Sequence, residues 1–170
     1  MKTKTKKTEC GDCRVPMEAR REVVNYPVAR GWSIKLAGTL VHTCPKCGEK
    51  EIHISKISAL SRTIAGEVVK KPGPLSGAEL SYLRDCLELT GRKFAEWIGV
   101  SAETLSRYET DREEIPTTKD RLVRLLVLNL YLRVLGETFP TIVEHTSTGS
   151  RAPLKLTVHA DKSGTWRRAA

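Results

Sequence analysis

Four cysteines form the clearest chemical pattern in the sequence. Cys10 and Cys13 are separated by two residues, and so are Cys44 and Cys47. Two such turns can direct four thiolates toward one point, and this is the tetrahedral sulfur set that Zn2+ takes in structural sites. Because protein ligands fill all four positions, none remains for a catalytic water. We therefore expect one structural zinc ion per chain, bound by Cys10, Cys13, Cys44 and Cys47.

Other interpretations of the cysteines stay open. Rubredoxin-like electron carriers hold iron between two turns of this spacing, and the string from Cys44 to Gly48 would suit such a site. The four residues could also be two unrelated reduced pairs. His42 and His53 flank the second turn, although four thiolates already saturate a zinc ion. Cys86 lies among apolar residues of an expected helix and is interpreted as a small core residue.

A second group of residues suited to binding lies between positions 90 and 110. Thr90 can cap a short helix that ends at Gly99, and Ser101 can cap another from residue 102 to about residue 110. Two helices joined by a turn of about three residues are typical of a helix-turn-helix unit, whose second helix enters the DNA major groove. The alternative is a plain helical hairpin with a solvated polar face.

The second of these helices has an apolar and a polar side. Leu105 and Tyr108 share the apolar side, whereas Arg107 lies on the other. We expect Arg107 to contact a base edge, because a guanidinium can pair with guanine O6 and N7. Further contacts to bases or phosphates are expected from Arg92, Ser101, Glu103, Thr104, Ser106 and Lys119.

The segment after Pro116 is apolar over most of its circumference. Leucine or valine occupies most positions from 122 to 135, which is more than one stripe against the preceding helices would need. We therefore expect a two-fold homodimer, which would place two recognition helices about 34–36 Å apart on a palindromic operator. The residues expected at the dimer interface are Val123, Val127, Leu130 and Val134.

The elements that position these residues fall into two differently patterned halves. Short alternating runs at 22–28 and 32–36 predict strands, and spacing over residues 54–69 predicts a helix. The string from Lys70 to Pro74 then predicts a linker. After it, Ser76 and Glu79 form a capping box that begins a helix from residue 77 to about residue 89.

The predicted fold class is α+β. A small β-rich zinc-binding domain covers residues 1–71, an all-α helix-turn-helix and dimerisation domain covers residues 72–140, and a basic tail covers residues 141–170. In this tail, residues 154–158 alternate like one strand, and Trp166 precedes two arginines. We favour disorder for the tail over a strand added to its own zinc domain or to a partner.

The charge is distributed unevenly along the 170 residues. The chain carries 29 Lys and Arg against 20 Asp and Glu, for a net charge of +9, which favours a polyanionic partner, nucleic acid first and anionic membrane second. Residues 1–75 hold 15 basic and 7 acidic side chains, whereas residues 76–140 hold 9 and 11. The helical half is thus slightly acidic, and its DNA recognition must depend on a few placed side chains.

Several function classes find no support in the sequence. The most apolar stretch is interrupted by Arg124, Asn129 and Arg133, so no membrane span is expected. The basic N-terminus is not followed by the apolar region of a signal peptide, and we expect a cytoplasmic protein with reduced thiols. There is no catalytic carboxylate pair, phosphate-binding glycine loop or nucleophile motif, and we do not expect an enzyme.

The order of these motifs resembles the MqsA-type (YgiT-type) antitoxins, whose second domain is of the XRE/Cro-like class. The resemblance covers about residues 8–137 and rests on the four cysteines and on the string that runs from Leu89-Thr90 through Leu105-Ser106-Arg107-Tyr108-Glu109. It implies a zinc domain that binds a toxin, often an mRNA-cleaving ribonuclease, and a helical domain that dimerises and represses its own operon.

By the same resemblance, the cysteines match the zinc ligands and Arg107 matches the base-contacting arginine. The family's base-contacting asparagine is Glu103 here, so the operator should differ, because glutamate cannot pair with adenine as asparagine does. We therefore expect an antitoxin-type repressor. The alternative is a zinc-containing helix-turn-helix regulator without a toxin partner, whose basic zinc domain adds DNA contacts.

Overall fold

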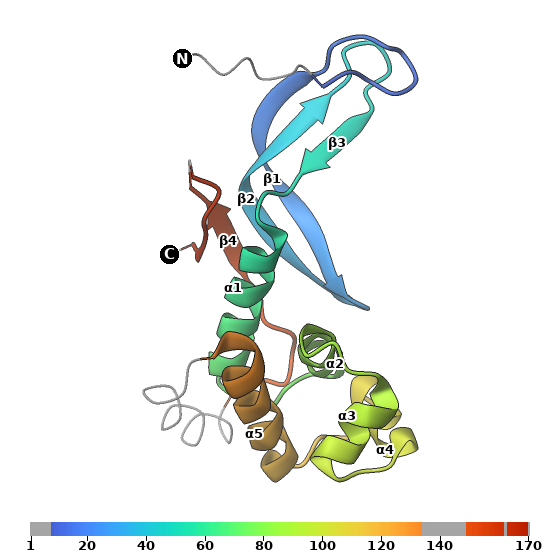
Figure 1. The fold of residues 1–170 in the computed structure, drawn as a ribbon, viewed down its shortest axis with the longest axis vertical. Coiled ribbons are helices and arrows are strands. Elements are labelled where there is room, and N and C mark those ends of the chain that lie inside the picture. Colours follow the sequence, from blue (N-terminus) through green and yellow to red (C-terminus); the bar gives the residue numbers. More distant parts are fainter. Residues whose placement is uncertain (1–7, 134–148, 162, 170) are drawn as a thin grey trace.

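The fold is α+β, and the part of the chain that the structure describes holds one five-stranded sheet and five α-helices (Figure 1). The computed structural model describes residues 8–133, 149–161 and 163–169. Val134, which the sequence places at a dimer interface, and residues 141–148 of the expected tail lie outside these ranges. Among the described residues, no helix is both long and apolar enough to cross a membrane.

A long antiparallel hairpin forms the body of the sheet. Strands β1 (Glu18–Ala29) and β2 (Trp32–Thr43) are joined by a tight turn in which Gly31 has a φ of 74°. Both strands extend well beyond the expected runs, because the pairing continues past two register shifts in β1. Strand β3 (Lys50–His53) pairs with β2 beside the cysteines. Strand β3 was not predicted from the sequence, since all four of its residues are exposed and show no alternation.

The C-terminal segment adds two strands to this sheet. Strand β4 (Thr157–Ala160) runs parallel to β2, and β5 (Trp166–Arg168) pairs antiparallel with β4. The preference for a disordered tail is therefore wrong for these residues, and the alternative of a strand on the chain's own sheet is observed. Leu156, Val158 and Trp166 are buried, and this apolar burial offsets the entropy lost on ordering the segment.

Three of the helices begin where the sequence predicts them, whereas the helix expected over residues 54–69 begins three residues later, at Ile57. Helices α2 (Gly77–Cys86), α3 (Gly91–Ile98) and α4 (Ala102–Glu109) are capped by Ser76, Thr90 and Ser101, whose side chains accept backbone N–H bonds. Helix α2 ends three residues earlier than expected. The remaining helical segments are α1 (Ile57–Lys70), α5 (Thr117–Leu126) and the π-helical η1 (Val127–Leu132).

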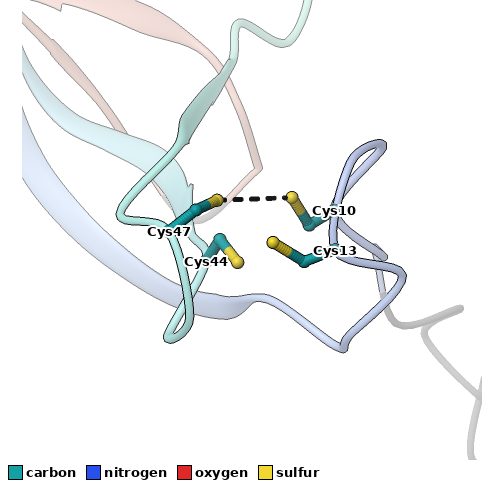
Figure 2. Close-up of side chains that lie close together, drawn as sticks. All are labelled: Cys10, Cys13, Cys44 and Cys47. Atoms are coloured by element: carbon teal, nitrogen blue, oxygen red, sulfur yellow. Dashed lines mark hydrogen bonds between the residues drawn. The ribbon is translucent and has the colours of Figure 1, made fainter.

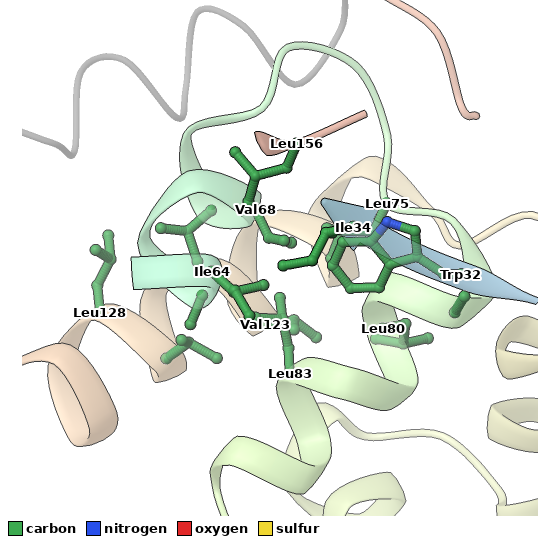
Figure 3. Close-up of a cluster of buried hydrophobic side chains, with 14 of the residues drawn as sticks. Trp32, Ile34, Ile64, Val68, Leu75, Leu80, Leu83, Val123, Leu128 and Leu156 are labelled. Carbon is green, nitrogen blue, oxygen red and sulfur yellow. The ribbon is translucent and has the colours of Figure 1, made fainter. Parts of the chain in front are cut away.

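One continuous core joins the sheet to the helices. Trp32 and Ile34 of the sheet lie in the same buried cluster as Ile64 of α1, Leu83 of α2 and Val123 of α5 (Figure 3). The boundary near residue 72 thus separates two sequence patterns that share one core.

The expected linker is held by a buried ion pair. Arg124 and Asp120 of α5 are each 1% exposed, and Arg124 Nε lies 2.5 Å from Asp120 Oδ1. The carboxylate's second oxygen accepts the N–H of Leu75 at 2.6 Å. At 2.7 to 3.4 Å, the arginine also donates to the backbone carbonyls of Val68, Val69, Lys71 and Gly73. It thereby joins carbonyls at the end of α1 to carbonyls of the linker.

A second buried pair ties the linker to the C-terminal segment. Lys71 Nζ lies 2.7 Å from Glu79 Oε2, and the two side chains are 5% and 0% exposed. Lys71 also donates to the carbonyl of Ala152, and Glu79 Oε1 accepts the N–H of Leu154 at 2.7 Å. Glu79, which completes the cap of α2, therefore also holds the segment that leads into β4.

Replacing Arg124 with methionine should lower the free energy of unfolding by about 3–5 kcal/mol, because Asp120 would remain buried without its cation. Methionine keeps the aliphatic stem, so the loss reports the charge. The control is Arg20→Met, which removes an ion pair to Glu18 with side chains 74% and 61% exposed and should cost less than about 1 kcal/mol. Urea unfolding of both variants provides the measurement, and equal losses would contradict the assigned role of Arg124.

Candidate functional site

The four cysteines of the two spaced pairs converge at the end of the long hairpin. The Sγ atoms of Cys10, Cys13, Cys44 and Cys47 all lie within 4.8 Å of one another, and Figure 2 shows them pointing inward from two loops. Cys10 Sγ and Cys47 Sγ are 3.7 Å apart, much farther than the roughly 2.05 Å of a disulfide. A tetrahedron with metal–sulfur bonds of about 2.3 Å has edges of about 3.8 Å. The cluster can therefore hold a metal ion.

The two cysteine turns share one backbone geometry. The N–H of Arg14 donates to the carbonyl of Cys10 at 2.9 Å, and the N–H of Gly48 donates to that of Cys44 at 3.0 Å. Both donors have positive φ, 53° for Arg14 and 78° for Gly48. Glycine adopts this conformation without strain, whereas arginine does so at a cost. Each turn thus reverses the chain tightly enough to direct both of its sulfurs to the same point.

The cluster distributes its protons unevenly. The pKa of Cys44 is lowered to about 7, chiefly because the backbone N–H of Cys47 donates to its sulfur. The pKa of Cys13 is raised to about 12, chiefly by the hydrogen bond between its thiol and Cys47. The lowered pKa favours the thiolate of Cys44, which is the form that binds metal. Because cysteine ligands must be deprotonated, the affinity of the cluster for a metal would fall as the pH falls.

Neither neighbouring histidine belongs to the cluster. The group of residues close enough to share a metal contains the four cysteines alone, without His42 or His53. A set of four thiolates suits soft or borderline ions such as Zn2+ and iron. Around it, Cys10, Cys44 and Met17 form a small buried cluster separate from the main core. The centre therefore organises the end of the hairpin, while Trp32, Ile34 and Leu36 at the other end are held by the helices.

Helix α4 presents a line of polar side chains to solvent. Leu105 and Tyr108 are buried and fix the helix, as the sequence predicts. On the opposite side, the Oγ of Ser101 lies 3.1 Å from Thr104 Oγ1, and Arg107 Nη2 donates to Thr104 Oγ1 at 3.2 Å. The structure thus brings Ser101, Thr104 and Arg107 together on one face.

The remaining expected DNA contacts lie on α3, α4 and α5. Arg92 of α3 and Ser106 of α4 are exposed. Glu103 is also exposed, and its pKa is lowered because its own backbone N–H and the Ser101 hydroxyl donate to its carboxylate. Lys119 of α5 reaches the turn between α3 and α4, with Nζ 3.4 Å from the carbonyl of Gly99. Glu103 and Ser106 therefore belong to the exposed side of α4, and Glu103 remains ionised there.

The expected dimer interface needs correction. Val123 and Val127 are 0% exposed within the chain's own core, so neither lies on a surface that a second chain could cover. The circumference of α5 and η1 is apolar because these segments pack against α1, α2 and α3 of the same chain. The expected dimer took into account packing of this segment against the preceding helices only, and not against α1. Leu130 is 46% exposed and is the one described member of the expected set that could meet another chain.

Sequence reasoning missed an acidic neighbour of the α4 surface. Glu113, in the loop after α4, places Oε2 3.1 Å from Arg107 Nε. It also missed the buried roles of Arg124 and Lys71. The spacing of Asp120 and Arg124, four residues apart within an apolar helix, was the available signal for the buried pair.

Comparison of the sequence with known protein families found no matching family, and comparison with curated proteins found no significant relative. Any functional assignment must therefore be argued from the geometry of the two sites described above.

The purified chain should contain one metal ion, and Cys44→Ser should lose it, because three thiolates and a weaker ligand bind metal less tightly. Cys86→Ser is the matched control, since Cys86 is a free cysteine outside the cluster. Removing the metal with a chelator should speed amide exchange in residues 8–17 and 43–50 and leave residues 32–36 protected. Full metal content in Cys44→Ser, or exchange that rises across the whole sheet, would contradict this assignment.

Proposed function

We propose that this chain is a sequence-specific DNA-binding regulator that inserts α4 into the major groove and carries one structural zinc ion. The observation that carries the proposal is the polar line of Ser101, Thr104 and Arg107, in which Ser101 and Arg107 are exposed and Thr104 is half-buried, on a short capped helix that buries Leu105 and Tyr108. These side-chain types can bond to base edges and phosphates.

The arrangement of α3 and α4 supports this role. Helix α3 ends at Gly99 in the left-handed conformation, and Ser101 begins α4 directly afterwards. Phe94, Ala95 and Ile98 bury the inner side of α3. Helix-turn-helix proteins present a recognition helix in this geometry. A short turn joins two helices, of which the first is anchored in the core and the second is exposed on one face.

The composition of the metal centre supports zinc. Four thiolates at tetrahedral spacing leave no open ligand position, as is usual in structural zinc sites. Zinc would neutralise two of the four thiolate charges. The centre would then stabilise the end of the hairpin without taking part in chemistry, so the proposed function is not enzymatic.

The proposal includes an antitoxin role, supported by the order of cysteine pairs, strands and helices along the chain. In this role the chain would form a homodimer on a palindromic operator, repress its own operon in the cytoplasm and bind a toxin protein through the zinc-containing half. Because Val123 and Val127 are buried, the dimer would use another surface, and Leu130 is its candidate member.

A second candidate is a regulator without a toxin, and one cleft favours it. Arg30 in the hairpin turn and Arg112 after α4 line the same cleft of about 530 Å3. Both arginines are exposed, and neither pairs with an acidic side chain among the described residues. The acidic residues of the cleft are already paired, Glu109 with Arg84 and Asp111 with Arg151. DNA held by α4 could therefore gain phosphate contacts from the sheet half.

Arg107→Ala should weaken binding to the preferred duplex by about 1–3 kcal/mol, because a bidentate contact to guanine would be lost. Fluorescence anisotropy with the preferred and a random duplex measures the loss. Arg167→Ala is the control, since Arg167 is an exposed arginine on β5. An equal loss on random DNA would show that Arg107 contacts only phosphate.

A mobility-shift assay on the DNA upstream of the chain's own gene, with and without the product of the neighbouring gene, separates the two candidates. If the neighbour is toxic when expressed alone and alters the shift, the antitoxin role is supported. The second candidate is favoured if the neighbour is harmless and the double variant Arg30→Ala, Arg112→Ala binds DNA more weakly, with an affinity that depends less steeply on salt concentration.

A further inference from the structure

The guanidinium of Arg107 is held on one side by two partners. Its Nε lies 3.1 Å from Glu113 Oε2, and its Nη2 donates to Thr104 Oγ1 at 3.2 Å. The partners come from different places, Thr104 from the preceding turn of α4 and Glu113 from the loop after the helix. A long exposed side chain would otherwise sample many rotamers. Here its direction is fixed without burying its charge, since Arg107 is 54% exposed.

The loop that carries Glu113 is itself fixed. The backbone N–H groups of Arg112 and Glu113 both donate to the carbonyl of Arg107, at 2.9 and 3.3 Å. Arg151, from the C-terminal segment, donates to the carbonyl of Glu113 at 3.0 Å and pairs with Asp111 and Glu114. The chain therefore folds back over the end of α4 and delivers the carboxylate of Glu113 to the arginine.

The two contacts leave the outer edge of the guanidinium available. A guanidinium has five N–H groups in a planar fork. Glu113 and Thr104 engage the edge formed by Nε and Nη2, while Nη1 and the second hydrogen of Nη2 have no partner among the described residues. Two parallel N–H groups at this end match the O6 and N7 acceptors of guanine in the major groove.

We propose that Glu113 is a positioning residue that sets the DNA specificity of Arg107. It fixes the guanidinium with the outer edge facing the groove, so that less conformational entropy is lost when guanine is bound. Its negative charge also repels any DNA phosphate that approaches Arg107, which lowers binding to unrelated DNA. This inference rests on the proposed DNA-binding function and adds a specificity determinant outside the recognition helix.

Glu113→Gln tests the inference, with Glu114→Gln as its matched control. Glu114 lies in the same loop and carries the same charge, but it makes no contact with Arg107 among the described residues. Its pair with Arg151 is 85% exposed on the Glu114 side, and without it Arg151 still holds the loop through the Glu113 carbonyl and Asp111. The first probe is a duplex selected from a random library for tight binding. The second is the same duplex with one guanine replaced by adenine, namely the guanine whose footprint is lost in Arg107→Ala. The measured quantity is the ratio of the two dissociation constants.

Glu113→Gln should lower this ratio at least threefold, whereas Glu114→Gln should leave it within twofold of the unsubstituted chain. In the Arg107→Ala background, Glu113→Gln should have no further effect on the ratio. The thermal unfolding temperature should change little, because the ion pair is exposed on both sides.

The outcomes separate the two levels of the proposal. If the unsubstituted chain distinguishes the duplexes but Glu113→Gln keeps its ratio, or Glu114→Gln lowers the ratio equally, the role of Glu113 is overturned and DNA binding stands. If the unsubstituted chain selects no duplex from the library, the DNA-binding function itself fails and the role of Glu113 fails with it.

Discussion

The guanidinium of Arg124 lies where α5, the end of α1 and the expected linker meet. It donates hydrogen bonds to backbone carbonyls of both α1 and the linker. A buried ion pair contributes little net stability, since desolvation cancels much of the attraction. Its effect is on arrangement, because the contacts of Arg124 and Asp120 join α5, the end of α1 and the linker at one point. Lys71 and Glu79 form a second buried pair, which bonds to the backbone of Ala152 and Leu154. This pair joins the C-terminal segment to the linker and α2.

This constraint connects the two candidate sites. The long hairpin carries the cysteine cluster at one end and packs on the helices near the other (Figure 1). The C-terminal segment runs from Arg151, beside the loop after α4, to the strands next to the middle of β2. The recognition surface proposed for α4 is therefore supported by α2 and α3, which pack against it, and by the C-terminal segment through Arg151. A short helix with few buried residues needs such support to present side chains in fixed directions.

The local features of the fold could be predicted from the sequence, whereas its long-range features could not. Caps at Ser76, Thr90 and Ser101, the turn at Gly99 and the grouping of four cysteines all follow from residue types a few positions apart. The strands of the C-terminal segment, the burial of Val123 and the partner of Arg107 depend on segments distant in sequence. The apolar pattern of residues 122–135 was interpreted as a dimer contact, whereas in the structure helices of the same chain, α1 among them, cover Val123 and Val127.

The central claim is that the sheet and the helices form one rigid body that holds α4 in place. Residual dipolar couplings of backbone amides, measured for the metal-loaded chain in a weakly aligning medium, test it most directly. One alignment tensor should describe the couplings of β1 and β2 together with those of α2 to α5. Two tensors of different magnitude, one for each half, would show that residues 70–74 act as a flexible linker and would contradict the claim.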